Sequence, residues 1–541
     1  MTSPCEIIEA NIPERRTFAI ISHPDAGKTT LTEKLLLYGG AIRLAGSVKA
    51  RKSNKYAVSD WMEIERQRGI SVTSSVMQFD YAGHRINILD TPGHQDFSED
   101  TYRTLVAADS AVMLIDAGKG VEEQTRKLFH VCRMRGIPIF TFINKLDRYG
   151  KDPFALVEEI EQVLGIQAYP MNWPIGMGRD FRGVYNRELQ QVEVFASGHP
   201  DQSVVPSVTG HITDIRFQEL LGAHAHRQIC DEIELLDMAG NQFDLPAIQQ
   251  GELTPVFFGS AMTNFGVRPF LERFLELAPP PAVRRTSKGT VTPRDKNFSG
   301  FIFKIQANMN PAHRDRIAFV RICSGKFERG MKVNHVQSGK SIRLAQPQQF
   351  LAQERTIVEE AYPGDIIGIS DPGIFRIGDT LSGDATQFKF EGIPSFPPEH
   401  FARVQTPDAM KRKQFIKGIH QLCEEGAVQL FKQPNIGIEA PIVGAVGALQ
   451  FEVLEYRLKN EYGVNVEILK LPYQMARWVA DKNFDYRRLT TMGTMFVMDE
   501  DDQPVILFEE SWALRSVEKL FPELALLEIS PAYSQEGNKP A

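Results

Sequence analysis

The sequence predicts an α/β fold: a doubly wound, mostly parallel sheet, followed by a small β-barrel domain and an α+β C-terminal domain. Three observations support this. Apolar strands alternate with helical patterns over residues 15–280, short alternating strands with glycine turns follow over 296–390, and helices and strands alternate again from residue 396. A chain of 541 residues is also too long for one core and suggests about three domains.

The first polar signature in the chain is Ser22-His-Pro-Asp-Ala-Gly-Lys-Thr29. It lies between the apolar run Thr17–Ile21 and a helix-like stretch, Thr29–Leu37. This strand–loop–helix order is the context of a phosphate-binding loop. Lys28 is expected to reach the β- and γ-phosphates of a nucleotide, and the Thr29 hydroxyl to coordinate Mg²⁺. The usual pattern opens with glycine, so Ser22 indicates a variant of the loop.

A second signature, Asp90-Thr-Pro-Gly-His94, ends the apolar strand Ile86–Leu89. A carboxylate at such a strand tip can hold a metal-bound water, and the Gly93 N–H can sense a γ-phosphate. The glycine turn can aim His94 at the attacking water. Elsewhere a lone histidine after a turn is more often a surface residue, and here its place among the signatures favours the functional interpretation.

The charged segment Gly46–Ser75 separates these two signatures and contains Arg68-Gly-Ile-Ser71. An ordinary solvated loop is one interpretation of it. Its position favours a switch that orders around γ-phosphate and Mg²⁺, with the Ser71 hydroxyl on the metal. Ile70 and Pro24 could then form an apolar barrier between His94 and the water until activation.

The last signature, Asn144-Lys-Leu-Asp147, closes the apolar strand Pro138–Ile143. The Asp147 carboxylate could accept two hydrogen bonds from guanine, and adenine lacks that pair of donors. The run Pro255–Phe258 precedes Gly259-Ser-Ala261, whose backbone would cap the guanine O6. That last element is too short to identify alone.

The ordered set predicts a P-loop GTPase domain, and therefore a GTP hydrolase with GTP or GDP and Mg²⁺ as cofactors. The expected metal ligands are Thr29, Ser71 and Asp90. The expected nucleotide contacts are Ser22, His23, Pro24, Asp25, Ala26, Gly27, Lys28, Thr29, Thr30, Asp90, Thr91, Pro92, Gly93, His94, Asn144, Lys145, Leu146, Asp147, Ser260 and Ala261.

These motifs resemble those of the ribosome-dependent translational GTPases, through Asp25-Ala-Gly-Lys-Thr-Thr30, the Arg-Gly-Ile switch and Asp90–His94. Within that group the chain is similar to the bacterial peptide chain release factor 3 family from about residue 15 to about residue 480. The stretches with this similarity are Arg16–Thr30, Asp96-Phe-Ser-Glu-Asp-Thr-Tyr-Arg-Thr-Leu105, Trp173-Pro-Ile-Gly176, Phe303-Lys-Ile-Gln-Ala-Asn-Met309 and Glu424-Glu-Gly-Ala-Val-Gln429.

The resemblance implies that His94 is the catalytic residue. It implies two partners, the ribosome (rRNA and ribosomal proteins) and a class I release factor bound to it. The segments Arg321–Gly330 and Pro363–Gly368 resemble the second domain of these GTPases. The implied function is ribosome-dependent GTP hydrolysis that promotes dissociation of class I release factors after peptide release. Ser71 departs from the family, where threonine is common, and keeps an oxygen ligand but loses a methyl.

Composition limits the class of protein. The net charge of −7 would be unusual in a protein that coats nucleic acid, so contact with rRNA would rely on local basic patches. No apolar run approaches the roughly twenty residues of a membrane span, and the N-terminus has no secretory core. The five cysteines are odd in number and far apart, which matches neither a disulfide framework nor a zinc site. A cytoplasmic monomer with reduced thiols is therefore expected.

We expect three domains: a GTP-binding domain over 1–282 with a subdomain inserted at about 165–250, a β-barrel domain over 296–390, and an α+β domain over 396–541. The insertion includes the strand-like Leu189–Phe195. Ala278–Arg285, poor in helix and strand formers, is expected to be a linker.

In the C-terminal domain, Leu449–Leu458 predicts an amphipathic helix that leads to the strand Val464–Ile468. A basic cluster lies beside Phe415 and is a candidate rRNA or phosphate contact, with a solvated helix face as the alternative. The chain ends before the two further domains of an elongation factor G, which argues against translocation. The cluster consists of Lys411, Arg412, Lys413 and Lys417.

Two other functions remain open at this point. One is another ribosomal GTPase, such as an elongation or rescue factor, which shares the chemistry but differs in what its outer domains contact. The other is a metabolic GTPase, for example a sulfate-activating subunit. Ribosomes should stimulate hydrolysis by the first and not by the second, and eviction of a class I release factor should set the termination factor apart.

Overall fold

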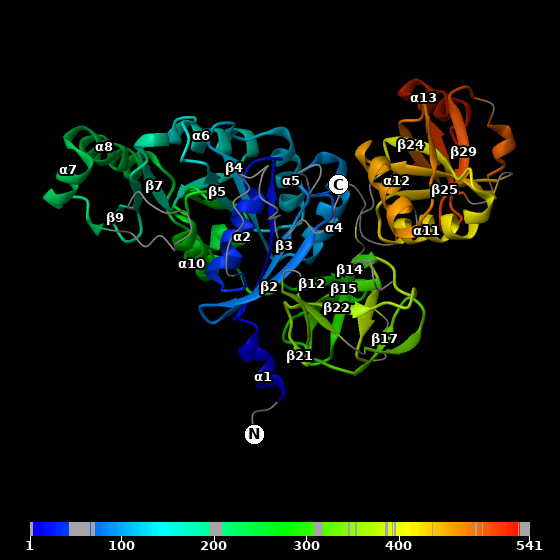
Figure 1. The fold of residues 1–541 in the computed structure, drawn as a ribbon, viewed down its shortest axis with the longest axis horizontal. Helices are drawn as coiled ribbons and strands as arrows, with labels where there is room; N and C mark the ends of the chain where they lie inside the picture. The colour runs from blue at the N-terminus through cyan, green and yellow to red at the C-terminus, as the bar shows by residue number, and fades with distance from the viewer. Residues whose placement is uncertain are drawn as a thin grey trace.

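The computed structural model describes residues 4–42, 65, 71–194, 208–307, 316–344, 347–351, 354–384, 388–391, 393, 397–434, 437–481, 484–489, 491–528 and 530. Figure 1 shows an elongated N-terminal part in blue to green, with α7 and α8 at its far end. A green to yellow part rich in strands lies beside it, and a yellow to red α+β part lies above that one. The predicted fold class is confirmed.

The N-terminal domain is built on a seven-stranded sheet of order β2-β3-β1-β4-β5-β11-β6. All neighbouring strands pair in parallel except β2 and β3. Parallel strands buried on both faces need continuous apolar runs, which is why these strands are visible in the sequence. They are β1 (Arg15–Ser22), β2 (Ser75–Tyr81), β3 (His84–Asp90), β4 (Ser110–Asp116), β5 (Ile139–Asn144), β6 (Gln167–Pro170) and β11 (Leu253–Phe258).

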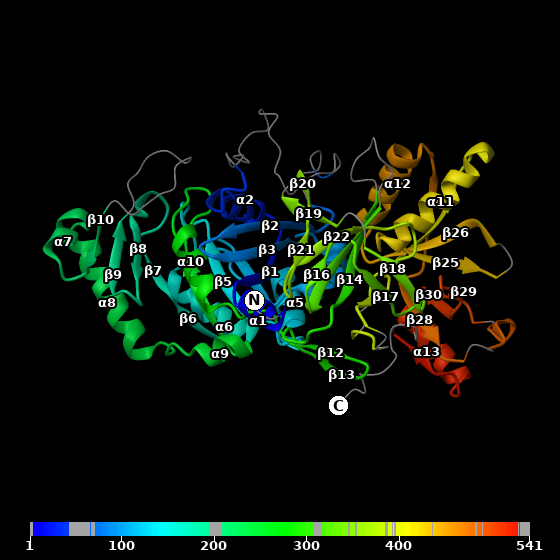
Figure 2. The ribbon, with the colours of Figure 1, turned by 90° about the horizontal axis from the view of Figure 1, so that it is seen from below.

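Helices cover both faces of this sheet. Leu35 of α2 and Phe270 of α10 belong to one apolar cluster, and Leu105 of α4 and Leu128 of α5 belong to another. Figure 2 shows α2 above the strands and α6 below them. The helical elements are α1 (Pro4–Asn11), α2 (Lys28–Tyr38), η1 (Gln95–Phe97), α4 (Ser98–Ala107), α5 (Glu123–Met134), α6 (Pro153–Leu164), α9 (Leu245–Gln250) and α10 (Val267–Leu277).

A small antiparallel sheet of order β10-β9-β8-β7 is inserted between β6 and α9. Because β6 pairs with β11 in the core sheet, we propose that the insertion begins after Pro170. The strand expected over Leu189–Phe195 is β9, which begins later, at Gln191, and Phe195 lies outside the described residues. The inserted elements are β7 (Asn172–Ile175), η2 (Gly178–Asp180), β8 (Gly183–Asn186), β9 (Gln191–Val194), β10 (Val208–His211), α7 (Ile215–Leu221) and α8 (Ala223–Ala239).

The second domain is a barrel-like antiparallel sheet of order β18-β17-β23-β14-β15-β22-β19-β20, which encloses an apolar core. The expected linker is shorter than predicted, because Arg284 and Arg285 already pair in a hairpin. The strands are β12 (Arg284–Thr286), β13 (Gly289–Val291), β14 (Ser299–Ala307), β15 (Arg316–Ser324), β16 (Phe327–Glu328), β17 (Lys332–His335), β18 (Lys340–Arg343), β19 (Gln348–Leu351), β20 (Glu354–Ile357), β21 (Glu360–Ala361), β22 (Ile366–Ser370) and β23 (Thr380–Ser382).

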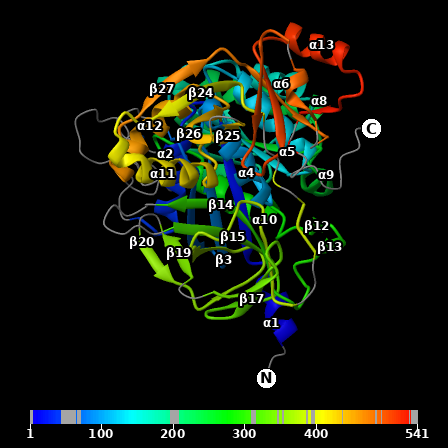
Figure 3. The ribbon, with the colours of Figure 1, turned by 90° about the vertical axis from the view of Figure 1, so that its right-hand side faces the viewer.

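The C-terminal domain has a sheet of order β27-β24-β26-β25-β29-β30-β28-β31. In Figure 3, α11 and α12 lie together and α13 lies apart from them. The elements are β24 (His400–Gln405), η3 (Ala409–Lys411), α11 (Arg412–Glu424), β25 (Gln429–Gln433), β26 (Gly437–Ala445), α12 (Leu449–Tyr462), β27 (Glu467–Leu471), β28 (Met475–Val479), η4 (Tyr486–Arg488), β29 (Thr494–Met498), β30 (Pro504–Phe508), α13 (Ser511–Leu520) and β31 (Leu526–Leu527).

Two predictions in this domain need correction. The strand expected from Val464 begins at Glu467, because Gly463 ends α12 in a left-handed conformation and Val464 turns into the core. Phe415 is also buried in that core, so it is no exposed partner of the basic cluster. The cluster itself is at the surface through Arg412, Lys413 and Lys417.

Four of the cysteines, Cys132, Cys230, Cys323 and Cys423, are free thiols among the described residues. Burial raises the pKa of Cys132 to about 12, so this thiol is inert at neutral pH. Within the described ranges, no helix combines the length and the apolarity that crossing a membrane requires.

Candidate guanine-nucleotide site

The phosphate-loop sequence forms a tight turn between β1 and α2. Gly27 precedes α2 with a φ of 99°, a left-handed conformation that favours glycine. A Cβ at Gly27 would also overlap the Asn144 side chain. The first backbone N–H groups of α2 have no partners within the helix and lie at the carboxyl end of β1, where an anion can bind them. The turn therefore has the geometry of a phosphate site.

Lys28 and Asp90 form a buried ion pair across this turn, with side chains 7% and 2% exposed. The Thr91 hydroxyl donates to the carbonyl of Ile20 at 2.7 Å, which ties the end of β3 to β1. The second signature therefore lies directly beside the first. Two buried opposite charges stabilise each other here, and removing either one would leave the other uncompensated.

The chain offers hard oxygen donors for a metal ion in this region. Thr29 is in the first turn of α2 and Asp90 is at the tip of β3, and hydroxyl and carboxylate oxygens suit Mg²⁺. Within the described residues no three His, Cys, Asp or Glu side chains are grouped to hold a metal, so phosphate oxygens and water would complete the shell. These donors fit Mg²⁺ bound together with a nucleotide.

The predicted switch is only partly described. Residues 46–64 and 66–70, including Ile70, lie outside the described residues, so the expected barrier between Ile70 and Pro24 stays a prediction. Ser71 is half-buried, and its place on the metal stays a prediction as well. The next residue, Val72, donates its N–H to Glu65 at 2.9 Å.

The fourth signature joins the phosphate loop to the loop after β11. Asn144 Nδ2 donates to the Ala26 carbonyl, and Asn144 Oδ1 accepts the Ala261 N–H, both at 2.8 Å. The Ser260 hydroxyl donates to Asp147 Oδ1 at 2.6 Å. The three segments therefore meet at one corner, where Asn144 has a scaffolding position and Asp147 is a candidate for contact with the base.

Asp116 is a residue of this site that sequence reasoning missed. Its carboxylate accepts from Lys145 Nζ at 2.7 Å and from the Gly118 N–H at 2.8 Å. Although burial alone would raise it, these hydrogen bonds hold the pKa of Asp116 below its ordinary value. The signal was present, since Asp116 ends β4 as Asp90 ends β3.

His94 lies at the turn before η1. Its Nδ1 accepts the Asp96 N–H at 3.2 Å and lies 3.3 Å from Asp96 Oδ1. The side chain is 30% exposed. Gly93, the residue before it, lies against the backbone of Pro24. The histidine is therefore next to the phosphate loop and still accessible.

Three family models match consecutive parts of the chain: "Elongation factor Tu GTP binding domain" over residues 13–280, "Elongation factor G domain 2" over 297–384 and "Class II release factor RF3, C-terminal domain" over 390–518. Peptide chain release factor 3 of Symbiobacterium thermophilum is 62% identical over 514 residues, which cover 95% of this chain and 97% of that protein. The chain belongs to the peptide chain release factor 3 family. The homologous factor of a Cyanothece strain is 54% identical, with 98% of each chain covered.

Membership in the release factor 3 family confirms the resemblance and extends it past residue 480, since the C-terminal family model continues to residue 518. With its GTP-binding domain, the chain is a GTPase of translation termination. Nothing in these comparisons favours an elongation, rescue or sulfate-activating GTPase. A crystal structure from Thermus thermophilus shares the fold, with a TM-score of 0.68 and 23% identity over 86% of this chain and 70% of that one.

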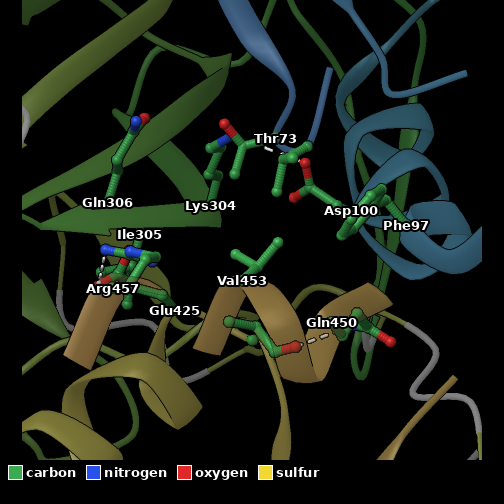
Figure 4. A pocket seen from close by; sticks show the side chains of 13 residues that line it. Thr73, Phe97, Asp100, Lys304, Ile305, Gln306, Glu425, Gln450, Val453 and Arg457 are labelled. Carbon is green, nitrogen blue, oxygen red and sulfur yellow. Dashed lines mark hydrogen bonds and ion pairs between the residues drawn. The ribbon is translucent and has the colours of Figure 1, made fainter. Parts of the chain in front are cut away.

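All three domains meet at a small cavity beside residues 72–74 and the start of α4. Figure 4 shows Lys304 of the barrel pointing toward Thr73 and Asp100 of the GTPase domain, with Val453 of α12 below them. Lys304 Nζ lies 3.7 Å from Asp100 and donates to the Ser74 hydroxyl at 3.0 Å. Residues 72–74 of the predicted switch therefore contact both the barrel and α12 directly.

Proposed function

We propose that the chain binds GTP or GDP with Mg²⁺, hydrolyses GTP when the ribosome stimulates it, and promotes dissociation of class I release factors after peptide release. The observation that supports this most is the meeting of the phosphate loop, Asp90 and the Asn144–Asp147 segment at the carboxyl ends of three parallel strands. The protein would act in the cytoplasm as a monomer, with the ribosome and a bound class I factor as its partners. The expected domain limits, 1–282, 296–390 and 396–541, belong to this proposal.

Lys28 and Asp90 would exchange partners when a nucleotide binds. Lys28 would turn from the Asp90 carboxylate to the β- and γ-phosphates, and Asp90 would hold a water on the metal ion. Because each buried charge gains a new opposite charge, neither is left uncompensated. Thr29 and Ser71 would supply hydroxyl oxygens to Mg²⁺, and the ion would neutralise charge on the phosphates.

His94 would orient the attacking water once the ribosome brings it into place. Before that step, the Asp96 N–H holds the ring through a hydrogen bond to Nδ1. The GTP-bound arrangement of the domains would displace the class I factor, and hydrolysis would then release this protein. The contacts of Lys304 and Val453 with the switch segments give nucleotide state a direct path to the outer domains.

Asp147→Asn should weaken GTP binding by about thirtyfold, or about 2 kcal/mol, and shift preference toward xanthine nucleotides. The carboxylate can accept from two guanine donors, whereas the amide can donate to the extra carbonyl of xanthine. Competition of GTP and XTP against a fluorescent GDP would measure it. Ser260→Ala is a useful control, because it removes the 2.6 Å hydrogen bond to Asp147 and leaves the carboxylate in place. If Asp147→Asn prefers GTP over XTP as strongly as wild type does, Asp147 does not read the base.

The decisive test of the proposed function is GTP turnover with and without ribosomes that carry a class I release factor. We expect ribosomes to stimulate hydrolysis strongly and the bound class I factor to leave in the presence of GTP. A turnover rate that is the same with and without ribosomes would favour a metabolic GTPase. Stimulated turnover without loss of the class I factor would favour another ribosomal function.

A further inference from the structure

Asp96 contacts both the proposed hydrolytic residue and the C-terminal domain. Its N–H donates to His94 Nδ1 at 3.2 Å, and its Oδ1 lies 3.3 Å from the same nitrogen. Its other oxygen, Oδ2, accepts the N–H of Leu449, the first residue of α12, at 2.8 Å. This side chain is largely buried. One carboxylate therefore lies between the histidine ring and a helix that is more than three hundred residues away in the chain.

Gly447, in the turn before α12, packs tightly against Asp96. The three nearest neighbours of a Cβ added at Gly447 would all be Asp96 atoms, and the Cβ would overlap them. Gly447 is not among the described glycines with positive φ, so glycine is required here for space and not for conformation. The turn before α12 is thus shaped to receive Asp96.

We propose that Asp96 is a positioning residue for His94, and that α12 holds Asp96 in place. This inference rests on the proposed role of His94 in hydrolysis. The Asp96 N–H pairs with Nδ1 when that nitrogen has a free lone pair, and Asp96 Oδ1 pairs with it when it carries a proton, so Asp96 holds the ring through Nδ1 in either form. The ring is then fixed through Nδ1, and Nε2 is the nitrogen available to the reacting groups.

Apolar packing next to Asp96 links the same helix to the switch segments. Phe97 forms a buried cluster with Val72 and Val453 of α12, and its ring centroid lies 6.2 Å from that of His94. A movement of α12 away from the GTPase domain would therefore release Asp96 and Phe97 together. The position of the C-terminal domain thereby sets how firmly His94 is oriented.

Gly447→Ala tests this inference from the C-terminal side of the interface, with the GTPase domain unaltered. Its methyl should displace Asp96, so single-turnover GTP hydrolysis on ribosomes should fall about tenfold, whereas the affinity for fluorescent GDP should stay within about twofold. Glu455→Ala is the matched control. It alters an exposed position of α12 itself and leaves Asp96 and Gly447 unchanged, so it should hydrolyse GTP as wild type does.

Variants of Asp96 itself separate positioning from simple packing. Asp96→Ala should slow hydrolysis about as much as Gly447→Ala, and Asp96→Asn should recover most of the rate, because its amide oxygen can still accept the Leu449 N–H. Ring ¹⁵N spectra of histidine-labelled full-length protein, assigned with His94→Ala, report the tautomer without ribosomes. Wild type and Glu455→Ala should give the same His94 ring signals, and Gly447→Ala and Asp96→Ala should shift them.

The outcomes distinguish this inference from the function on which it rests. Wild-type ring signals and hydrolysis in both Gly447→Ala and Asp96→Ala would overturn the positioning role, even if His94→Ala remained slow and the proposed function stood. An equal loss in Glu455→Ala would also overturn it, since the effect would then be a general disturbance of α12. Normal hydrolysis by His94→Ala would instead refute the proposed function.

Discussion

Lys28→Ala is expected to lower the affinity for GTP and GDP by about a thousandfold or more, because it removes the charge that faces the β- and γ-phosphates in a buried site. The structure adds a second consequence. Lys28 neutralises the buried Asp90 carboxylate, so the variant should also be less stable by about 3 kcal/mol without nucleotide. Titration with fluorescent GDP measures the first effect and thermal unfolding measures the second.

Lys127→Ala is the control for this experiment. Lys127 is on α5 of the same domain, its side chain is 52% exposed, and its ion pair with Glu123 is at the surface. Such pairs contribute little to stability, so this variant should bind nucleotide and unfold as wild type does. Wild-type affinity in a folded Lys28→Ala protein would rule out the assignment of the phosphate loop.

His94→Ala should leave GTP binding nearly unchanged and slow ribosome-stimulated hydrolysis by about a hundredfold or more. The proposed phosphate and base contacts belong to other residues, chiefly Lys28, Thr29 and Asp147. Because displacement is assigned to the GTP-bound arrangement, the variant should still remove a class I factor and then remain on the ribosome. Single-turnover hydrolysis and a factor-release assay on one preparation measure both effects.

His84→Ala is a suitable comparison, since His84 starts the same strand that Asp90 ends and its ring contacts a nearby carbonyl, that of Ala82. It should hydrolyse GTP at the wild-type rate. Normal hydrolysis by His94→Ala would remove His94 from the mechanism. Failure to displace the class I factor with GTP bound would mean that hydrolysis itself drives displacement.

Several features of the site could be predicted because they are local in sequence. A strand buried on both faces must be apolar, and a polar signature directly after it must lie at the carboxyl edge of the sheet. This rule holds for the segments Ser22–Thr29, Asp90–His94 and Asn144–Asp147. Asn144 contacts Ala26 in the first of these segments and Ala261 in the loop after β11, so it joins the three parts of the site. Asp116 follows the same rule and was overlooked because its signature is a single residue.

Other features depend on partners that are distant in the chain. In the sequence, Lys304 is one more charged residue of a strand, but in the structure it is buried beside Ser74 and Asp100. In the sequence, Phe415 is a neighbour of basic residues. In the structure its side chain is in the core, whereas Arg412 and Lys413 are exposed. Periodicity gives the face of an element but not what covers that face.

The sequence by itself determined the order of the elements, the nucleotide-binding signatures and the family, because strand ends, loops and helix starts are set by neighbouring residues. Only the tertiary structure decided that Lys28 is paired with Asp90, that Asn144 spans two loops, and that Asp96 joins His94 to α12. These contacts arise when separate elements pack and buried polar groups must find partners. No local pattern specifies which distant group that partner will be.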